Sequence, residues 1–98
     1  MKGEDMLYFY IMNNPDVKNR CKVGITKNPD QRIKAYQTAN PSCYFSYLIE
    51  IDNKVHEKLI IDILKDVFFT SREYIYGHPE IVENIISGYF DDLTNKPI

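Results

Sequence analysis

Short apolar segments alternate with polar clusters along the first half of the chain, and this pattern predicts three strands. Leu7–Met12 is an unbroken run of apolar and aromatic residues, which is typical of a buried strand. The turn cluster Asn13–Asp16 follows it, and Cys21–Ile25 then alternates in part between polar and apolar residues. These two segments predict antiparallel strands joined by a protruding loop that is too long for a tight hairpin. A third strand is expected over Tyr44–Ile51 from its length and aromatic content.

Three segments carry the signals of helices. Residues 28–30 read Asn-Pro-Asp, in which asparagine can cap a helix, proline suits its first turn and the acid complements the helix dipole. This helix should end before Pro41. A second helix is expected to open at residues 52–53, with an apolar stripe through residues 55–64. A third is expected over about residues 79–92.

The order of these elements predicts an α+β domain with a small antiparallel sheet of about three strands flanked by helices. The order is β-β-α-β-α-(β)-α, in which the bracketed strand is a short edge segment over residues 72–76. The pattern leaves the structure of the apolar segment 67–69 open. Ninety-eight residues suit one domain over residues 1–98.

Composition is that of a globular domain and excludes several other classes. Apolar residues make up 44% of the chain and charged residues 27%, which argues against disorder. No apolar run approaches the ~20 residues that span a bilayer, and no signal peptide pattern is present. Cys21 and Cys43 form neither a disulfide framework nor a zinc motif, and no glycine-rich phosphate loop occurs. We therefore expect an intracellular protein with free thiols, no membrane partner and no small-molecule cofactor.

Charge is distributed unevenly along the chain. The overall balance, 12 basic against 14 acidic residues with a pI near 5.6, argues mildly against a nucleic-acid partner. Between Val17 and Lys34, however, only Asp30 opposes the basic residues. This basic segment is consistent with a phosphate-facing side, and equally with ordinary solvated charge, which the pattern alone favours. Its basic residues are Lys18, Arg20, Lys22, Lys27, Arg32 and Lys34.

Four chemical features follow one another in a recognisable order. Tyr8-Phe9-Tyr10 lies on the first strand and Lys22-Val23-Gly24 on the second; Arg32 follows on a helix, and Glu57 lies early in the next long helix. This order resembles the GIY-YIG nuclease superfamily, most closely its divergent branch from phages, large DNA viruses and some fungal proteins. Each motif alone is weak, whereas their order and spacing together are fairly specific.

The resemblance covers roughly residues 7–76 and includes two further segments. Residues 37–41 after the first helix and residues 72–75, which are similar to a Glu-Trp-Phe motif, also fit that branch. A member of that branch would be a viral protein that works in the host cytoplasm or nucleus. A bare catalytic core would bind DNA weakly, form a homodimer or act within a larger complex.

The resemblance implies hydrolysis of a DNA phosphodiester with one Mg²⁺ or Mn²⁺ ion. Carried over by position, Tyr10 would activate or position the attacking water, Arg32 would stabilise charge on the phosphate, and Glu57 would bind the metal. A fixed cation and a metal both stabilise the charge that develops on phosphorus oxygens. His56, beside Glu57, would add proton transfer or a phosphate contact, or is an ordinary histidine near a helix start.

Two departures from the family pattern open an alternative. Tyr8 stands where the first motif begins with glycine, and Lys22 stands where the second begins with tyrosine. A lysine can contact phosphate, or act as a base if its pKa is depressed, but it does not replace a phenol. Tyr10 would need the metal or Lys22 to lower its pKa before acting as a base. The alternative is therefore a catalytically impaired module that binds nucleic acid or protein.

A third reading assigns no role to the motif residues. The acidic C-terminal helix, residues 79–92, would then be a surface for a protein partner. In this reading, as in the others, the later aromatic residues are expected in the core or at an edge rather than as platforms for bases. These aromatic residues are Phe68, Phe69, Tyr74 and Tyr76.

Overall fold

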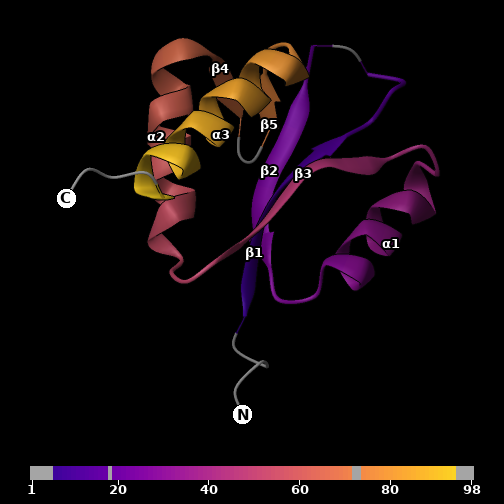
Figure 1. Ribbon diagram of the computed structural model, residues 1–98. Coiled ribbons are helices and arrows are strands. Elements are labelled where there is room, and N and C mark those ends of the chain that lie inside the picture. Colours follow the sequence, from indigo (N-terminus) through magenta and orange to yellow (C-terminus); the bar gives the residue numbers. More distant parts are fainter. Residues whose placement is uncertain (1–5, 18, 72–73, 95–98) are drawn as a thin grey trace.

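Five antiparallel strands form one sheet, and helices cover both of its faces (Figure 1). The computed structural model describes residues 6–17, 19–71 and 74–94. Across the sheet the strands follow the order β3-β1-β2-β5-β4. In chain order the elements are β1 (Leu7–Asn13), β2 (Cys21–Thr26), α1 (Pro29–Ala39), β3 (Tyr44–Ile51), α2 (Val55–Val67), β4 (Phe69–Ser71), β5 (Tyr74–Tyr76) and α3 (Pro79–Thr94).

Strand β1 lies between β2 and β3, and its successive side chains alternate between the two faces of the sheet. Tyr10 is opposite Gly24 on β2 and opposite Leu48 on β3. Because successive side chains of a strand point to opposite faces, Phe9 and Ile11 face one side of the sheet and Tyr10 faces the other. Both neighbours of Tyr10 in sequence, and Tyr10 itself, are fully buried.

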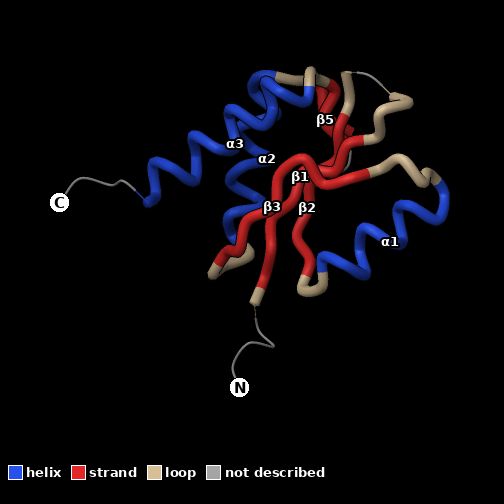
Figure 2. The backbone as a smooth tube through the Cα atoms, turned by 45° about the vertical axis from the view of Figure 1, so that its right-hand side comes forward, coloured by secondary structure: helices blue, strands red, loops and turns tan. Residues whose placement is uncertain are grey.

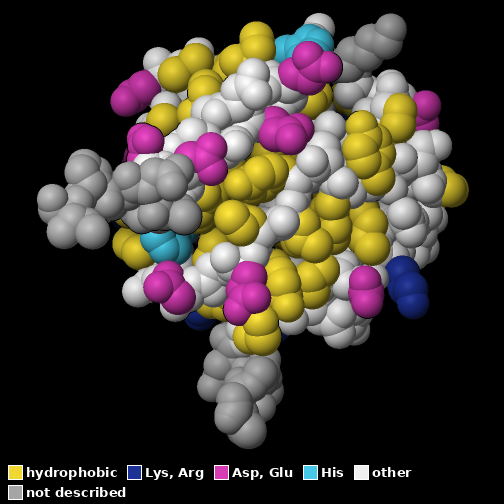
Figure 3. Space-filling view, in the orientation of Figure 1, with side chains coloured by type: hydrophobic (Ala, Val, Ile, Leu, Met, Phe, Trp, Pro, Cys, Tyr) yellow, Lys and Arg dark blue, Asp and Glu magenta, His cyan; other side chains and the backbone are white. Residues whose placement is uncertain are grey.

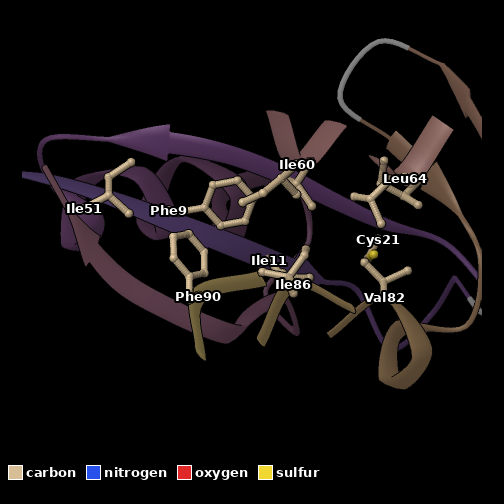
Figure 4. Close-up of a cluster of buried hydrophobic side chains, with 11 residues drawn as sticks. Phe9, Ile11, Cys21, Ile51, Ile60, Leu64, Val82, Ile86 and Phe90 are labelled. Atoms are coloured by element: carbon tan, nitrogen blue, oxygen red, sulfur yellow. The ribbon is translucent and has the colours of Figure 1, made fainter. Parts of the chain in front are cut away.

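The two faces carry two separate hydrophobic clusters. The larger lies under α2 and α3, where Phe9 and Ile11 meet Ile60, Leu64 and the inner stripe of α3 (Figure 4). The smaller lies under α1, which Figure 2 shows on the opposite side of the sheet from α2 and α3. Its members are Tyr10, Met12 and Cys43, with Ile33, Tyr36 and Phe45 packed against them.

The predicted α+β class is confirmed, but the expected number of strands is wrong. The sheet has five strands because two three-residue strands, β4 and β5, extend it beyond β2. The segment 67–69, whose structure the sequence pattern left open, divides between a helix and a strand: α2 ends at Val67, and β4 starts at Phe69. The sequence indicated β5 as the short edge segment over residues 72–76 but did not indicate β4, because strands this short show no periodicity.

Helix ends agree closely with the expected signals. The side chain of Asn28 caps α1 by accepting a hydrogen bond from the Gln31 amide at 3.1 Å. Helix α2 starts at Val55, two residues later than expected, because the Asn53 side chain accepts from the Val55 amide at 2.9 Å and holds a turn there. Helix α3 continues past residue 92 to Thr94. Among the described residues, no helix combines the length and the apolar character needed to cross a membrane.

Candidate functional site

The buried Tyr10 ring lies directly over Gly24 of the neighbouring strand. A Cβ atom at position 24 would approach the Tyr10 hydroxyl to 2.7 Å and Cζ to 2.9 Å, which are distances that side chains do not tolerate. Glycine is therefore required opposite Tyr10. The glycine of the second motif thus has a structural reason: it makes room for the tyrosine of the first.

Helix α1 brings two side chains to the Tyr10 hydroxyl. Arg32 and Tyr36 are four residues apart and so lie on one face of the helix. The Nη1 atom of Arg32 donates to the Tyr10 hydroxyl at 3.2 Å, and the Tyr10 and Tyr36 hydroxyls are 2.8 Å apart. The Tyr10 cluster, defined as Tyr10, Arg32 and Tyr36, therefore joins the tyrosine and the arginine that the resemblance singles out.

The electrostatics of the cluster keep Tyr10 protonated. Burial, reinforced by Tyr36, raises the pKa of Tyr10 above its ordinary value, and the opposing influence of Arg32 does not cancel this. Desolvation lowers the pKa of Arg32, but its interactions with Tyr10 and Tyr36 outweigh this and raise it, so the guanidinium stays charged. A base at this position would need the opposite change in the Tyr10 pKa.

Lys22 extends the site along β2. Its ammonium group lies 5.0 Å from the ring centre of Tyr36 and 5.2 Å from that of Tyr74. The guanidinium of Arg20 lies 4.5 Å from the ring centre of Tyr74. Both cations therefore lie within the range of cation–π attraction to half-exposed tyrosines. The register that pairs Lys22 with Tyr74 across β2 and β5 creates this arrangement.

These side chains surround a cavity of about 260 Å³, which we call the Lys22 pocket. Two cations, two phenols and two amides line it over an apolar base, and none of its described lining residues is Asp or Glu. The lining comprises Met12, Asn14, Val17, Arg20, Cys21, Lys22, Ala35, Tyr36, Ala39, Asn40, Cys43 and Tyr74. Such a surface attracts an anion.

Helix α2 carries the predicted glutamate and histidine on the other side of the sheet. Glu57 precedes Ile60 and Leu64 on the helix, and these two side chains pack into the large cluster under α2 and α3. Next to it, His56 Nδ1 is 2.9 Å from the Tyr89 hydroxyl, and His56 Nε2 is 3.2 Å from Asp52 Oδ1. The structure therefore brings Tyr10 and Arg32 together but sets Glu57 on the helix that packs on the opposite face.

The remaining predicted residues are scattered around the site. Tyr8 is half-buried on β1, two residues before Tyr10 and opposite Thr26. Lys27 and Lys34 are exposed, the first just after β2 and the second on α1, and neither lines the Lys22 pocket. Lys18 lies outside the described part of the chain, as do residues 72–73 of the segment that is similar to a Glu-Trp-Phe motif.

Sequence reasoning missed two residues of the site. Tyr36 had a usable signal, because it follows Arg32 by four residues and so shares its helix face. Tyr74 lies in the segment 72–75 that resembles a family motif, but it was expected in the core or at an edge, and only the pairing of β2 with β5 brings it to Lys22.

The three residues of the Tyr10 cluster include no carboxylate, the ligand that a divalent metal ion prefers. Mg²⁺ and Mn²⁺ take oxygen ligands, carboxylates foremost. Within the described ranges no group of three or more His, Cys, Asp or Glu could hold a metal ion. The carboxylate assigned to the metal by resemblance, Glu57, belongs to α2 and not to the α1 face.

Comparison with models of known protein families gives a match over most of the chain. The T5orf172 domain family matches residues 7–89, which include every described strand and most of α3. This family is found in phage and viral proteins and is associated with nuclease-type folds of the GIY-YIG kind. Neither the curated proteins nor the solved structures gave a significant match. Because the family match covers most of the chain, the protein belongs to the T5orf172 domain family.

Proposed function

We propose that the protein is a DNA-binding module that holds backbone phosphates on the α1 face of its sheet. The observation that carries this proposal is the Lys22 pocket, which Lys22 and Arg20 line together beside the rings of Tyr36 and Tyr74. Arg32 adds a third cation on the same face through the Tyr10 cluster. A fixed guanidinium suits phosphate oxygens well because of its fork of donors.

The negative net charge does not oppose this function, because several acidic residues lie on another face, although Asp16 and Asp30 lie near the α1 face. On the face seen in Figure 3, acidic and apolar side chains dominate, and Lys and Arg appear only near its edge. That view shares the orientation of Figure 1, in which α1 lies to one side and α3 lies forward. A local group of cations is sufficient for phosphate contacts, since screening in salt removes the influence of distant charges.

Salt dependence of DNA affinity tests this proposal. Fluorescence anisotropy would measure binding of a labelled DNA duplex across a salt series for wild type, Lys22→Gln and Arg20→Gln. Each substitution should weaken binding and reduce the slope of log K against log salt by about 1, because one phosphate contact is lost. Lys65→Gln on the exposed part of α2 makes the same charge change away from the pocket and should leave the slope unchanged. Equal effects of Lys65→Gln and Lys22→Gln would refute the proposal.

Hydrolysis of DNA is the second candidate, and one observation favours it. The 3.2 Å hydrogen bond from Arg32 to Tyr10 joins the two residues that the resemblance assigns to catalysis. In this proposal Mg²⁺ or Mn²⁺ is supplied in solution and Glu57 is its ligand. Against it stand the raised pKa of Tyr10, due first to burial, and the placement of Glu57 on α2.

A cleavage assay separates the two functions. Linear, nicked and branched DNA would be incubated with wild type, Arg32→Ala and Glu57→Gln in Mg²⁺ or Mn²⁺, after circular dichroism confirms that each variant is folded. Binding without cleavage by the wild type is the result expected for the DNA-binding module. Cleavage by the wild type that both substitutions abolish would instead establish the nuclease.

A further inference from the structure

We propose that the Lys22 pocket receives one unpaired nucleotide of DNA, with its base against the tyrosine rings and its phosphate at Arg20 and Lys22. This inference rests on the proposed DNA-binding function and adds to it the form of DNA that the site selects. It concerns the pocket itself, whereas backbone binding requires only the cations on the α1 face.

The walls of the pocket are aromatic as well as cationic. Tyr36 comes from α1 and Tyr74 from β5, and both are half-exposed while lining the cavity. Every nucleobase has a flat face that stacks on such rings, so this kind of contact does not depend on sequence. The ammonium of Lys22, at 5.0 and 5.2 Å from the two ring centres, is placed for a phosphate that belongs to a base beside the rings.

The remainder of the lining suits the edge and the body of a base. Met12 and the two buried cysteines supply apolar surface below the tyrosines. The amides of Asn14 and Asn40 supply donors and acceptors of the kind that base edges recognise. Asn14 Oδ1 already accepts from the Asp16 amide at 3.0 Å, so the Asn14 amide group is held in place by the loop.

Size and shape exclude a paired base. At about 260 Å³ the cavity is smaller than the roughly 300–1,000 Å³ of pockets for drug-sized ligands, so it has room for a single base, with the phosphate at its rim, and not for a base pair. A base inside a duplex is covered above and below by its neighbours and cannot reach the rings unless it leaves the stack. The pocket therefore favours single strands, ends or flipped nucleotides over continuous duplex.

The test compares three DNA probes with one substitution and its matched control. The probes are a labelled oligothymidylate, an oligomer of equal length whose sugars carry no bases, and a short duplex. Tyr74→Leu removes the ring that lines the pocket. Tyr76→Leu removes a tyrosine from the same strand, two residues away and 5.8 Å from the Arg20 guanidinium, that does not line the pocket. Thermal unfolding would confirm that both variants are folded.

Wild type should bind oligothymidylate more tightly than the base-free oligomer. Tyr74→Leu should weaken oligothymidylate binding by about 5- to 150-fold, the range for loss of one base stack, and weaken binding of the base-free oligomer and the duplex much less, through the lost ring contacts of Arg20 and Lys22 alone. Tyr76→Leu should change none of the three affinities. The dependence on the base separates this role from a structural one, since a damaged fold would weaken binding of all three probes to a similar extent.

Two results would overturn the inference, and they differ from failure of the proposed function. Equal affinity of wild type for oligothymidylate and the base-free oligomer would show that no base enters the pocket. Unchanged oligothymidylate binding by Tyr74→Leu would show that no base stacks on the Tyr74 ring. If both results occurred while Lys22→Gln still weakened duplex binding, the proposed binding of DNA backbone phosphates would be supported and the binding of a base would be refuted. If wild type bound no probe, the proposed function and this inference would fail together.

Discussion

Replacing Tyr10 by phenylalanine tests the Tyr10 cluster with the smallest available change. The substitution removes one hydroxyl, which is 2.8 Å from the Tyr36 hydroxyl and accepts from Arg32 at 3.2 Å, and it leaves the buried ring in place. Each such hydrogen bond contributes about 0.5–1.5 kcal/mol net. Arg32 and Tyr36 are only half-buried, so water can satisfy them after the change. We therefore expect the free energy of unfolding to fall by about 1–3 kcal/mol.

Urea denaturation at neutral pH would measure this loss. Tyr44→Phe is the matched control, because the Tyr44 side chain is 48% exposed and its hydroxyl lies outside the cluster. It should change the free energy of unfolding by less than about 0.5 kcal/mol, as is usual for exposed positions. Equal stability of Tyr10→Phe and the wild type would refute the cluster as a source of stability.

The same pair of proteins gives a pH dependence whose sign follows from the structure. The pKa of Tyr10 is raised in the folded state, first by burial, so folding favours the neutral phenol. The resulting stability is fully present below the ordinary tyrosine pKa of about 10 and is lost as the pH rises from there toward the folded-state value. The stability difference between wild type and Tyr10→Phe should therefore stay constant at neutral pH and shrink above about pH 10. A difference that grows over that range would contradict the assigned direction.

Three further substitutions or treatments have definite expected outcomes. Gly24→Ala should cost about 1–3 kcal/mol in urea denaturation, because the new Cβ would meet the Tyr10 hydroxyl at 2.7 Å; a variant as stable as wild type would contradict this. Asn28→Ala should lower stability by about 1 kcal/mol by removing the cap on the Gln31 amide, whereas Asn28→Gly should cost only a few tenths. Burial raises the pKa of Cys21 to about 12, so this thiol should resist iodoacetamide at pH 8 in the folded protein and react in urea; rapid labelling of folded protein, read by mass spectrometry, would disprove it.

Much of the fold is predictable because its longer elements carry their own local signals. The apolar run Leu7–Met12 became β1 with one added residue, and the expected helix start at residues 28–30 is capped as expected. Strand β4 escaped prediction because it has only three residues, and β5 was expected only as a short edge segment over residues 72–76, since it joins the sheet by pairing with the distant β2. Such pairing depends on the tertiary structure, which local patterns do not record.

Only part of the candidate site follows from the sequence. The spacing of the motifs led to Tyr10 and Arg32, which the structure joins by a hydrogen bond, although their catalytic roles stay a prediction. It could not show on which side of the sheet Glu57 would lie, since that depends on how α2 packs. Tyr74 required the register of β5 against β2, a long-range feature. The site therefore combines residues with local signals and residues that only the folded chain assembles.

Mapping the DNA contact surface by NMR tests the central claim most directly. Backbone amide shifts of ¹⁵N-labelled protein would be followed while oligothymidylate is added. The account predicts that the largest changes occur on the α1 face, at Lys22, Tyr36 and Tyr74, and that exposed residues of α2 such as Leu59 and Lys65 change little. Shift changes concentrated on α2 and α3, with the Lys22 pocket unaffected, would contradict it.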